Sequence, residues 1–343
     1  MIWRLARLWS GEQMQLYEGA LKEIAATNSD VIVMTAENRA AIRNLPQALC
    51  ERFIDVGICE QTLIGAAAGL ALRGRIPVVH ALASFLTLRA FEFIRTDIGI
   101  PALPVKMIGA LPGFLSEANG PTHQSLEDIA LMRSIPGVQI FCPADQQELV
   151  IGLQSIVDSP SPCYVRCNVR EECYKHNSDF QIGKAEIVSE GSDVTILVYG
   201  FLFQEALIAS SLLECRGVSV RLINLRTLEP VDEKAILESA RESTLIVALE
   251  DHFQRGGLFS ILCELLVSNY LTCNVLPISF DRRWFKPALL DDALKYEGFT
   301  GDQIAKRILK VLREKGGIQC QIPFASTKTT RASRSLMSTI LAP

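Results

Sequence analysis

Residues Ile54-Asp55-Val56-Gly57-Ile58-Cys59-Glu60-Gln61 form the stretch around which the chain is organised, and a run of small and apolar residues, 62–72, follows at once. Apolar residues stand on both sides of Glu60, so we expect its carboxylate to lie in a dry environment. A carboxylate removed from water needs a partner or stays protonated. Such a group can share a proton with a bound heterocycle. The alternative is that Glu60 only caps the following helix, where the helix dipole favours an anion.

The length of 343 residues predicts two domains. A hydrophobic fraction of 49% and a charged fraction of 21% are typical of a well-packed globular protein. The net charge of −4 gives no reason to expect nucleic acid or a membrane surface as a partner. The longest apolar run, 63–72, is far shorter than the roughly 20 residues that span a membrane.

Ten cysteines are scattered along the chain without a Cys-x-x-Cys pair. This distribution predicts neither a zinc site nor a disulfide framework, and we expect no metal ligands in this chain. The amino terminus is too short to hold the apolar segment of a secretory signal. We therefore expect a cytoplasmic protein with reduced thiols.

Strands and helices are expected to alternate along the first half of the chain, which predicts an α/β fold with a parallel sheet covered on both faces. The expected strands are 31–35, 53–58, 77–81, 105–109 and 138–142, and the expected helices are 14–27, 61–72, 86–97 and one that begins after Asp145. These elements make a first domain over residues 11–170.

A polar, charged linker is expected over 171–181, and a second, smaller α/β domain over 182–314. Its expected strands are 194–199, 219–224 and 245–250, and its expected helices are 204–215, 233–240 and 258–267. The remainder, 315–343, is rich in Ser, Thr and basic residues, and we expect it to be disordered.

His123 lies in Gly120-Pro121-Thr122-His123-Gln124, a loop that precedes an expected helix. Loops at the edge of a parallel sheet are where ligands of such folds are contacted. A lone histidine of this kind can also be an ordinary surface or capping residue.

Taken together, these stretches resemble the transketolase family over nearly the whole chain, from about Gln13 to Leu312. The family's Glu-Gln signature is matched by 56–61, its small-residue helix by 66–71, and its Thr-His-Gln loop by 122–124. Shorter matches lie between and after them, at Ser84-Phe85, Arg89-Ala90-Phe91, Ile94-Arg95, Ile135-Pro136 and Pro143-Ala144-Asp145.

The resemblance implies a two-domain thiamine diphosphate fold, in which a pyrimidine-binding domain is followed by the family's carboxy-terminal domain. It implies that Glu60 is catalytic and hydrogen-bonds the pyrimidine ring, and that Phe85 stacks on that ring, although Phe85 could instead be a core aromatic. Ile58 and Arg89 are the further cofactor contacts that we expect. His123 matches the family's histidine that contacts the donor's oxygens, and it is expected to be both catalytic and substrate-binding.

Departures from the family pattern lie in the substrate pocket. Asn119 replaces the aspartate that contacts a donor hydroxyl, Leu111 replaces a phosphate-contacting histidine, and Met14 aligns with a phosphate-binding arginine. Arg166 alone remains of the usual phosphate group, and we expect it to bind substrate. Because arginine contacts to phosphate are strong, their loss suggests an unusual donor or acceptor.

We expect the diphosphate-binding domain of the family to be missing here, since its Gly-Asp-Gly motif occurs nowhere in the sequence. The resemblance therefore implies a split enzyme whose amino-terminal subunit is a separate chain and holds the diphosphate and Mg²⁺. An α2β2 assembly is the expected stoichiometry. The reaction implied is transfer of a two-carbon ketol unit from a ketose to an aldehyde.

Other assignments remain open. The β subunit of a 2-oxo acid dehydrogenase shares both domains, but the Thr-His-Gln loop favours the transketolase branch. Deoxyxylulose phosphate synthase is also similar, and it carries its own diphosphate domain. A non-catalytic partner subunit is the alternative from another class. Glu250-Asp251-His252 fits no common metal spacing and is expected to be structural.

Overall fold

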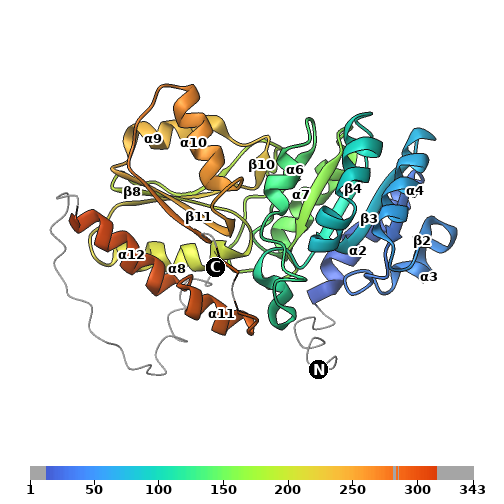
Figure 1. Ribbon diagram of the computed structural model, residues 1–343, viewed down its shortest axis with the longest axis horizontal. Coiled ribbons are helices and arrows are strands. Elements are labelled where there is room, and N and C mark those ends of the chain that lie inside the picture. Colours follow the sequence, from blue (N-terminus) through green and yellow to red (C-terminus); the bar gives the residue numbers. More distant parts are fainter. Residues whose placement is uncertain (1–12, 281–282, 285, 315–343) are drawn as a thin grey trace.

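The computed structural model describes residues 13–280, 283–284 and 286–314, and it contains two sheets that lie side by side with helices on both faces of each (Figure 1). The predicted α/β class with parallel sheets is thereby confirmed. The tail predicted over 315–343 lies outside the described residues.

The first sheet has seven strands in the order β10-β5-β6-β4-β3-β1-β2. Six of them come from the first half of the chain and run parallel: β1 (Val31–Thr35), β2 (Phe53–Asp55), β3 (Ile76–Leu82), β4 (Lys106–Ala110), β5 (Gln139–Phe141) and β6 (Cys163–Cys167). The seventh, β10 (Thr227–Glu229), comes from the second half and pairs antiparallel with β5. The two halves are therefore joined by a shared sheet as well as by the linker.

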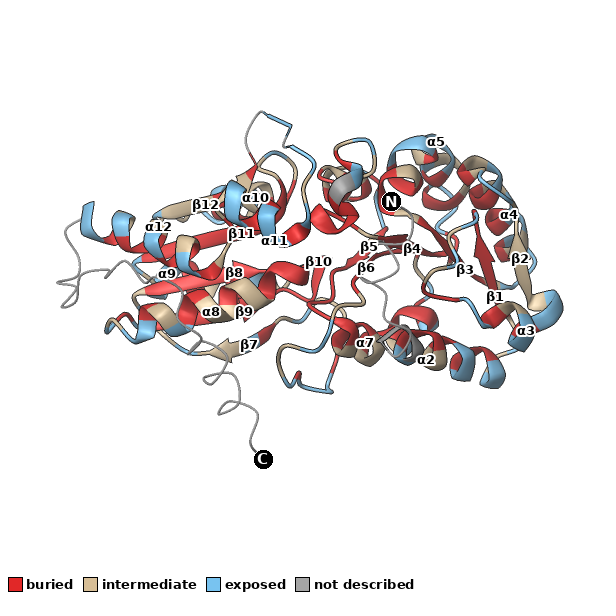
Figure 2. Ribbon diagram, turned by 90° about the horizontal axis from the view of Figure 1, so that it is seen from below, coloured by how far each residue is buried: buried red, intermediate tan, exposed pale blue. Residues whose placement is uncertain are grey.

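Helices cover the two faces of this sheet as separate layers (Figures 1 and 2). One layer holds α4 (Glu60–Leu72), η2 (Phe85–Arg89), α5 (Phe91–Phe93), η3 (Ile94–Gly99) and α6 (Asp128–Arg133). The other holds α2 (Gln13–Thr27), α3 (Leu45–Leu49) and α7 (Gln146–Asp158), and the short turns η1 (Cys50–Arg52) and η4 (Phe114–Asn119) lie in loops.

Two predicted elements differ from the structure. The helix expected over 86–97 is divided, because η2 and η3 are π-helical and α5 is a single turn between them. The strand expected over 53–58 ends at Asp55, whose side chain accepts a hydrogen bond from the Gly57 amide at 2.9 Å, and Gly57 has a φ of +74°. This turn redirects the chain toward Glu60.

The second sheet has five strands in the order β12-β11-β8-β9-β7, parallel except for β7. The strands are β7 (Glu186–Ser189), β8 (Val194–Val198), β9 (Val220–Asn224), β11 (Leu245–Phe253) and β12 (Val275–Phe280). Around them lie η5 (Gly200–Leu202), α8 (Phe203–Glu214), α9 (Glu233–Glu242), α10 (Leu258–Ser268), α11 (Leu290–Glu297) and α12 (Gly301–Glu314).

One hydrophobic core continues through both domains. It joins Leu63 and Ile94, from the α4 layer of the first sheet, to Ile246 and Leu262 of the second domain. Burial of such a continuous apolar surface stabilises the domains as one unit. This arrangement fixes the second domain against the loops that leave the first sheet.

Candidate active site

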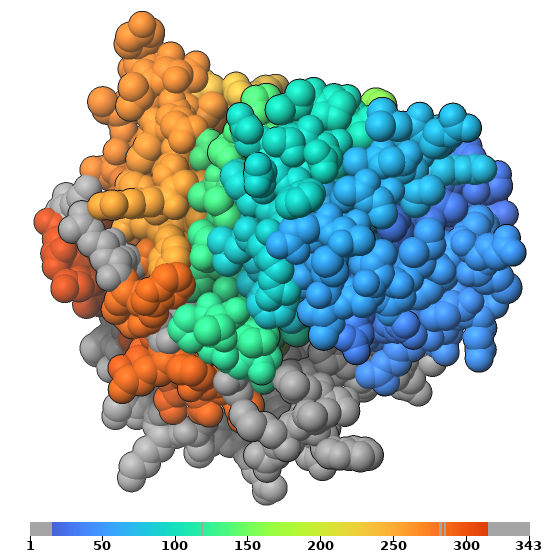
Figure 3. All heavy atoms as spheres, turned by 45° about the vertical axis from the view of Figure 1, so that its right-hand side comes forward, coloured from blue at the N-terminus to red at the C-terminus, as the bar shows by residue number. Residues whose placement is uncertain are grey.

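Three of the predicted site residues follow the carboxyl ends of strands in the first sheet. Glu60 follows β2, Phe85 follows β3, and His123 lies in the loop after β4. The carboxyl ends of parallel strands lie at one edge of the sheet, where ligands of α/β folds bind. Figure 3 shows the green segment that contains η4 beside the orange segment that leads into α11, and Gly120 packs there against Pro287. The second domain thus supports the loop that carries His123.

Glu60 is the first residue of α4 and is only 2% exposed. The prediction of a dry environment is therefore confirmed. Its Oε2 lies 2.7 Å from Nη1 of Arg89, whose side chain is 40% exposed. The ion pair joins a buried acid to an arginine that reaches solvent.

Phe85 and Arg89 lie four residues apart on η2, and Arg89 contacts Glu60 while Phe85 lies beside His123. The guanidinium carbon of Arg89 lies 4.2 Å from the centre of the Phe85 ring. The Phe85 and His123 ring centres are 5.1 Å apart. Phe85 is half-buried, whereas its neighbour Leu86 is fully buried in the core. π-helical turns such as η2 are frequent at functional sites.

His123 is held by its neighbours in a defined position. Ser84 Oγ donates to the carbonyl oxygen of His123 at 3.0 Å, and Thr122 Oγ1 lies 2.8 Å from Nδ1 of the imidazole. Among the described residues, no hydrogen bond reaches its other ring nitrogen, Nε2. That edge of the ring is free to contact a ligand.

Asp55 supports the loop between β2 and Glu60. It accepts hydrogen bonds from the amides of Gly57 and Glu37 and from Arg39 Nε at 2.7 Å. Burial works to raise the pKa of Asp55, but these hydrogen bonds outweigh it and lower the pKa. The carboxylate therefore stays charged and keeps the loop closed. This role of Asp55 was not predicted from the sequence, although the residue lies in the stretch that precedes Glu60.

Ile58 and Asn119 lie in loops near this edge with less specific contacts. Ile58 is 70% exposed. Asn119 is exposed on η4, and its amide donates to Ser116 Oγ at 3.4 Å. Leu111 has a φ of +54°, which costs a non-glycine residue energy, and it packs partly against the second domain's core.

Arg166 is placed differently from the prediction that it binds substrate. It is 2% exposed, and its Nε lies 2.9 Å from Asp128 Oδ2 while its Nη1 lies 2.6 Å from Asp251 Oδ1. The ring of Tyr199 lies beside it, with 5.3 Å between the guanidinium carbon and the ring centre. Because two buried carboxylates already occupy the guanidinium, the geometry gives Arg166 a role in joining the two domains.

The acids around Arg166 were not predicted as its partners. Asp128 begins α6 and Asp251 lies in β11, which supplies the Glu-Asp-His stretch. Burial raises the pKa of Asp251 to about 6 although Arg166 opposes the shift. Glu250 accepts from the amides of Leu258 and Phe259 at the start of α10. These contacts agree with the structural role that was expected for the stretch.

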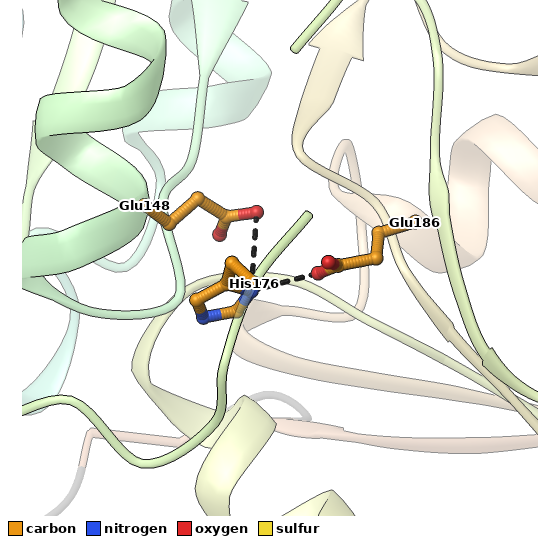
Figure 4. Close-up of side chains that lie close together, drawn as sticks. All are labelled: Glu148, His176 and Glu186. Atoms are coloured by element: carbon orange, nitrogen blue, oxygen red, sulfur yellow. Dashed lines mark hydrogen bonds and ion pairs between the residues drawn. The ribbon is translucent and has the colours of Figure 1, made fainter. Parts of the chain in front are cut away.

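A second buried ion network lies at the linker (Figure 4). His176 Nδ1 lies 2.7 Å from Glu186 Oε2 and 3.8 Å from Glu148 Oε1, and its Nε2 lies 3.1 Å from Asp145. Ligand atoms of Glu148, His176 and Glu186 are close enough to hold a metal ion. However, Arg226 already pairs with both glutamates, at 2.8 Å and 3.0 Å, so cationic side chains neutralise this cluster. The composition of 171–181 had indicated only a linker.

The chain matches two protein-family models in succession. Residues 13–172 match the transketolase pyrimidine binding domain, and residues 183–304 match the transketolase C-terminal domain.

Individual relatives agree with these models. The chain is 35% identical to the 6-deoxy-6-sulfo-D-fructose transketolase subunit SqwH of Clostridium sp. (strain MSTE9), over 87% of this chain and 94% of the relative. It is 31% identical to an apulose-4-phosphate transketolase subunit of Phocaeicola vulgatus, over 76% and 86%. A solved structure described as "Split gene transketolase, inactive beta4 tetramer" superposes with a TM-score of 0.77 at 31% identity, covering 88% of this chain and 98% of that one.

Within the described part of the chain, every helix is too short or too polar to cross a bilayer. The nine described cysteines are all free thiols.

Proposed function

The chain belongs to the transketolase family, and we propose that it is the pyrimidine-binding subunit of a two-chain enzyme that transfers a ketol unit with thiamine diphosphate. The observation that carries the proposal is the position of Glu60. Its carboxylate is buried at the start of α4, faces the ring of Phe85 through Arg89, and has an exchangeable partner. An aminopyrimidine ring needs such an acid beside an aromatic face, so these residues fit that part of the cofactor.

Each site residue then has a defined task. Thiamine diphosphate, when bound, supplies the electron sink for cleavage and formation of a carbon–carbon bond. Glu60 holds a proton at a ring nitrogen of the pyrimidine, Phe85 orients the ring by stacking, and His123 directs Nε2 toward oxygens of the sugar. The ordered Ser84 and Thr122 contacts fix the imidazole before the substrate arrives.

The diphosphate and Mg²⁺ belong in our proposal to a second chain. This sequence has no Gly-Asp-Gly motif, and Mg²⁺ prefers oxygen ligands together with phosphates and waters. Relatives of nearly the same length are themselves subunits, according to their names. We propose an α2β2 complex in which each site forms between chains, and the free cysteines of this chain suit the cytoplasm.

The substrate pocket suggests a donor or acceptor outside the pentose phosphates. Arg166, the one candidate for a phosphate contact, is held by Asp128 and Asp251 inside the protein. We infer that this chain contributes little to binding of a substrate phosphate at the position where other members of the family bind it. The names of the relatives mention 6-deoxy-6-sulfo-D-fructose and apulose 4-phosphate, which supports an unusual sugar as substrate.

The cofactor proposal is tested by calorimetric titration of thiamine diphosphate with Mg²⁺ into this chain, into the purified partner and into their mixture. We expect binding by the mixture only. Tight binding by this chain alone would show that the diphosphate site is not supplied by a partner. If no combination bound the cofactor, the non-catalytic alternative would replace our proposal.

The role of Glu60 is tested in the same complex with Glu60→Gln. Loss of a proton-transfer group typically lowers the rate by about 10²- to 10⁴-fold, and we expect ketol transfer to fall by this amount. Glu172→Gln, an exposed change in the linker, serves as the matched control. A Glu60→Gln complex with full activity would exclude Glu60 from catalysis.

The substrate proposal is tested with a panel of ketose donors that differ only at the terminal group. We expect a sulfonated or non-phosphorylated ketose to have a kcat/KM at least about tenfold above that of xylulose 5-phosphate. A tenfold ratio corresponds to one lost anion contact of about 1.4 kcal/mol. Efficient turnover of ordinary pentose phosphates would contradict it.

A further inference from the structure

The guanidinium of Arg89 makes two contacts at the proposed pyrimidine site. Its Nη1 donates to Glu60 Oε2 at 2.7 Å, and its central carbon lies 4.2 Å from the centre of the Phe85 ring. A guanidinium is planar, donates N–H groups from its edge and stacks on aromatic faces. An aminopyrimidine ring is also planar and stacks on aromatic faces, and when its ring nitrogen is protonated it too donates N–H groups from its edge. The same acid and the same aromatic face therefore suit either group.

We propose that Arg89 is an internal stand-in for the pyrimidine ring, which pairs with Glu60 and covers Phe85 in the absence of cofactor and leaves when the cofactor enters. This inference rests on the proposed function. It assigns Arg89 a role opposite to that of a cofactor ligand, because the arginine and the ring compete for the same partners.

The burial of the two charges supports this exchange. Glu60 is 2% exposed, so its carboxylate would be costly to leave without a partner. The Arg89 side chain is 40% exposed, so its long stem can turn into solvent without movement of the backbone. Glu60 is also the sole hydrogen-bond acceptor of Arg89 within the described ranges.

The position of Arg89 on η2 couples its release to exposure of the aromatic face. Phe85 and Arg89 are four residues apart, a spacing that places side chains beside each other on a helical surface. When Arg89 turns outward, Glu60 and Phe85 become available together. A site with only the carboxylate or only the aromatic ring would offer the guanidinium one of these two contacts.

The competition has a measurable consequence for binding. Because one partner of the ion pair is exposed, the competition is modest, and the stand-in should weaken cofactor binding by about two- to fivefold. Removing the guanidinium removes this competition. Methionine is the suitable replacement, because it keeps an apolar stem over Phe85 and has no donor for Glu60.

The first test is calorimetric titration of thiamine diphosphate with Mg²⁺ into the reconstituted two-chain complex. Arg89→Met should bind the cofactor about two- to fivefold more tightly than the wild type. Arg73→Met, at the opposite end of α4, is the matched control and should leave the affinity unchanged. Weaker binding by Arg89→Met would identify Arg89 as a cofactor ligand and overturn the stand-in.

The second test uses the free chain and needs no cofactor. Arg89→Met leaves the buried Glu60 charge without its partner, so its thermal midpoint should fall by about 2–4 °C. Glu60→Gln in the Arg89→Met background should recover most of that loss, because the charge is gone. An unchanged midpoint in Arg89→Met would show that the buried Glu60 does not need Arg89 as its partner in the free chain, and would overturn the proposal.

The two tests separate this inference from the proposed function. Absence of cofactor binding by both the wild-type and variant complexes would overturn the proposed function, and the stand-in with it. Binding by the wild type together with weaker binding by Arg89→Met would overturn the stand-in alone.

Discussion

Two arginines in this protein meet buried acids, and they differ in their own exposure. Arg89 pairs with Glu60 but is 40% exposed, whereas Arg166 pairs with Asp128 and Asp251 and is 2% exposed. The first pair can be opened by rotating one side chain into water. The second is buried on both sides, and its Arg166–Asp251 contact joins the two domains. A buried acid with an exchangeable partner is therefore the better sign of a binding site, and a closed network is the sign of a structural one.

The largest effect on the free energy of unfolding is expected from Arg166→Met in the free chain. The variant leaves Asp128 and Asp251 buried without a cation, and breaking a buried ion pair in this way costs about 3–5 kcal/mol. Denaturant unfolding of wild type and variant measures the difference.

The control for this change removes the charges as well. Arg166→Met combined with Asp128→Asn and Asp251→Asn should recover more than half of the loss, since no unpaired charge remains. If Arg166→Met alone cost less than about 1 kcal/mol, the comparison between the two arginines would fail, and Arg166 would again be available to a ligand.

The second largest loss of stability is expected from a substitution that crowds Asp251. Gly113 has a φ of +57°, and a Cβ built on it would lie 1.6 Å from Asp251 Oδ2. Gly113→Ala therefore has to displace the partner of Arg166, and we expect a loss of about 2–4 kcal/mol.

Gly137→Ala is the matched control for Gly113→Ala. Gly137 also has a positive φ, +81°, but nothing lies within 4 Å of its built Cβ. Gly137→Ala should lower the free energy of unfolding by only about 1 kcal/mol, the cost of a positive φ at alanine. Equal losses in the two variants would show that the contact with Asp251 is not a tight one.

The buried ion network at the linker is expected to make the free energy of unfolding depend on pH. Burial works to lower the pKa of His176, but hydrogen bonds to Asp145 and Glu186 and the charge of Glu148 raise it from 6.5 to about 10. A raised folded pKa means that the stabilisation is complete below the unfolded pKa and is lost as the pH rises through about 10. Between these values the loss is at most about 1.4 kcal/mol per pH unit.

His176→Gln isolates this contribution. The wild type should lose free energy of unfolding between pH 7 and pH 9.5, at roughly 1 kcal/mol per pH unit, and the variant should show a flatter dependence. Urea unfolding at four or five pH values gives both slopes. Parallel slopes would mean that His176 does not hold its proton in the folded protein.

The contrast between the two arginines also shows what a sequence can predict. Strands such as Val31–Thr35 are continuous apolar runs, and Glu60 and Phe85 follow such runs closely, whereas His123 was placed only in a loop. The resemblance to the family was needed to assign the three residues to one site. The alternating order of strands and helices was enough for the fold class. The motifs that resemble the family supplied the rest of the prediction.

Contacts between distant segments were not predictable in this way. Arg166 lies in β6, a fully buried strand that was not among the predicted strands, and its partner Asp251 is 85 residues away. The antiparallel pairing of β10 with β5 likewise depends on how the domains meet. Spacing along the chain contains no information about which of several carboxylates an arginine will choose.

The smallest change in stability is expected at the proposed catalytic acid, and it completes the comparison. Glu60→Gln keeps an amide oxygen that can accept the hydrogen bond from Arg89. Since an ion pair with one exposed partner contributes about 0–1 kcal/mol, the free chain should unfold within about 1 kcal/mol of the wild type. Denaturant unfolding of Glu60→Gln measures this, with Arg166→Met as the reference for a closed network. A loss as large as that of Arg166→Met would show that Glu60 has a structural role and not a ligand-binding one.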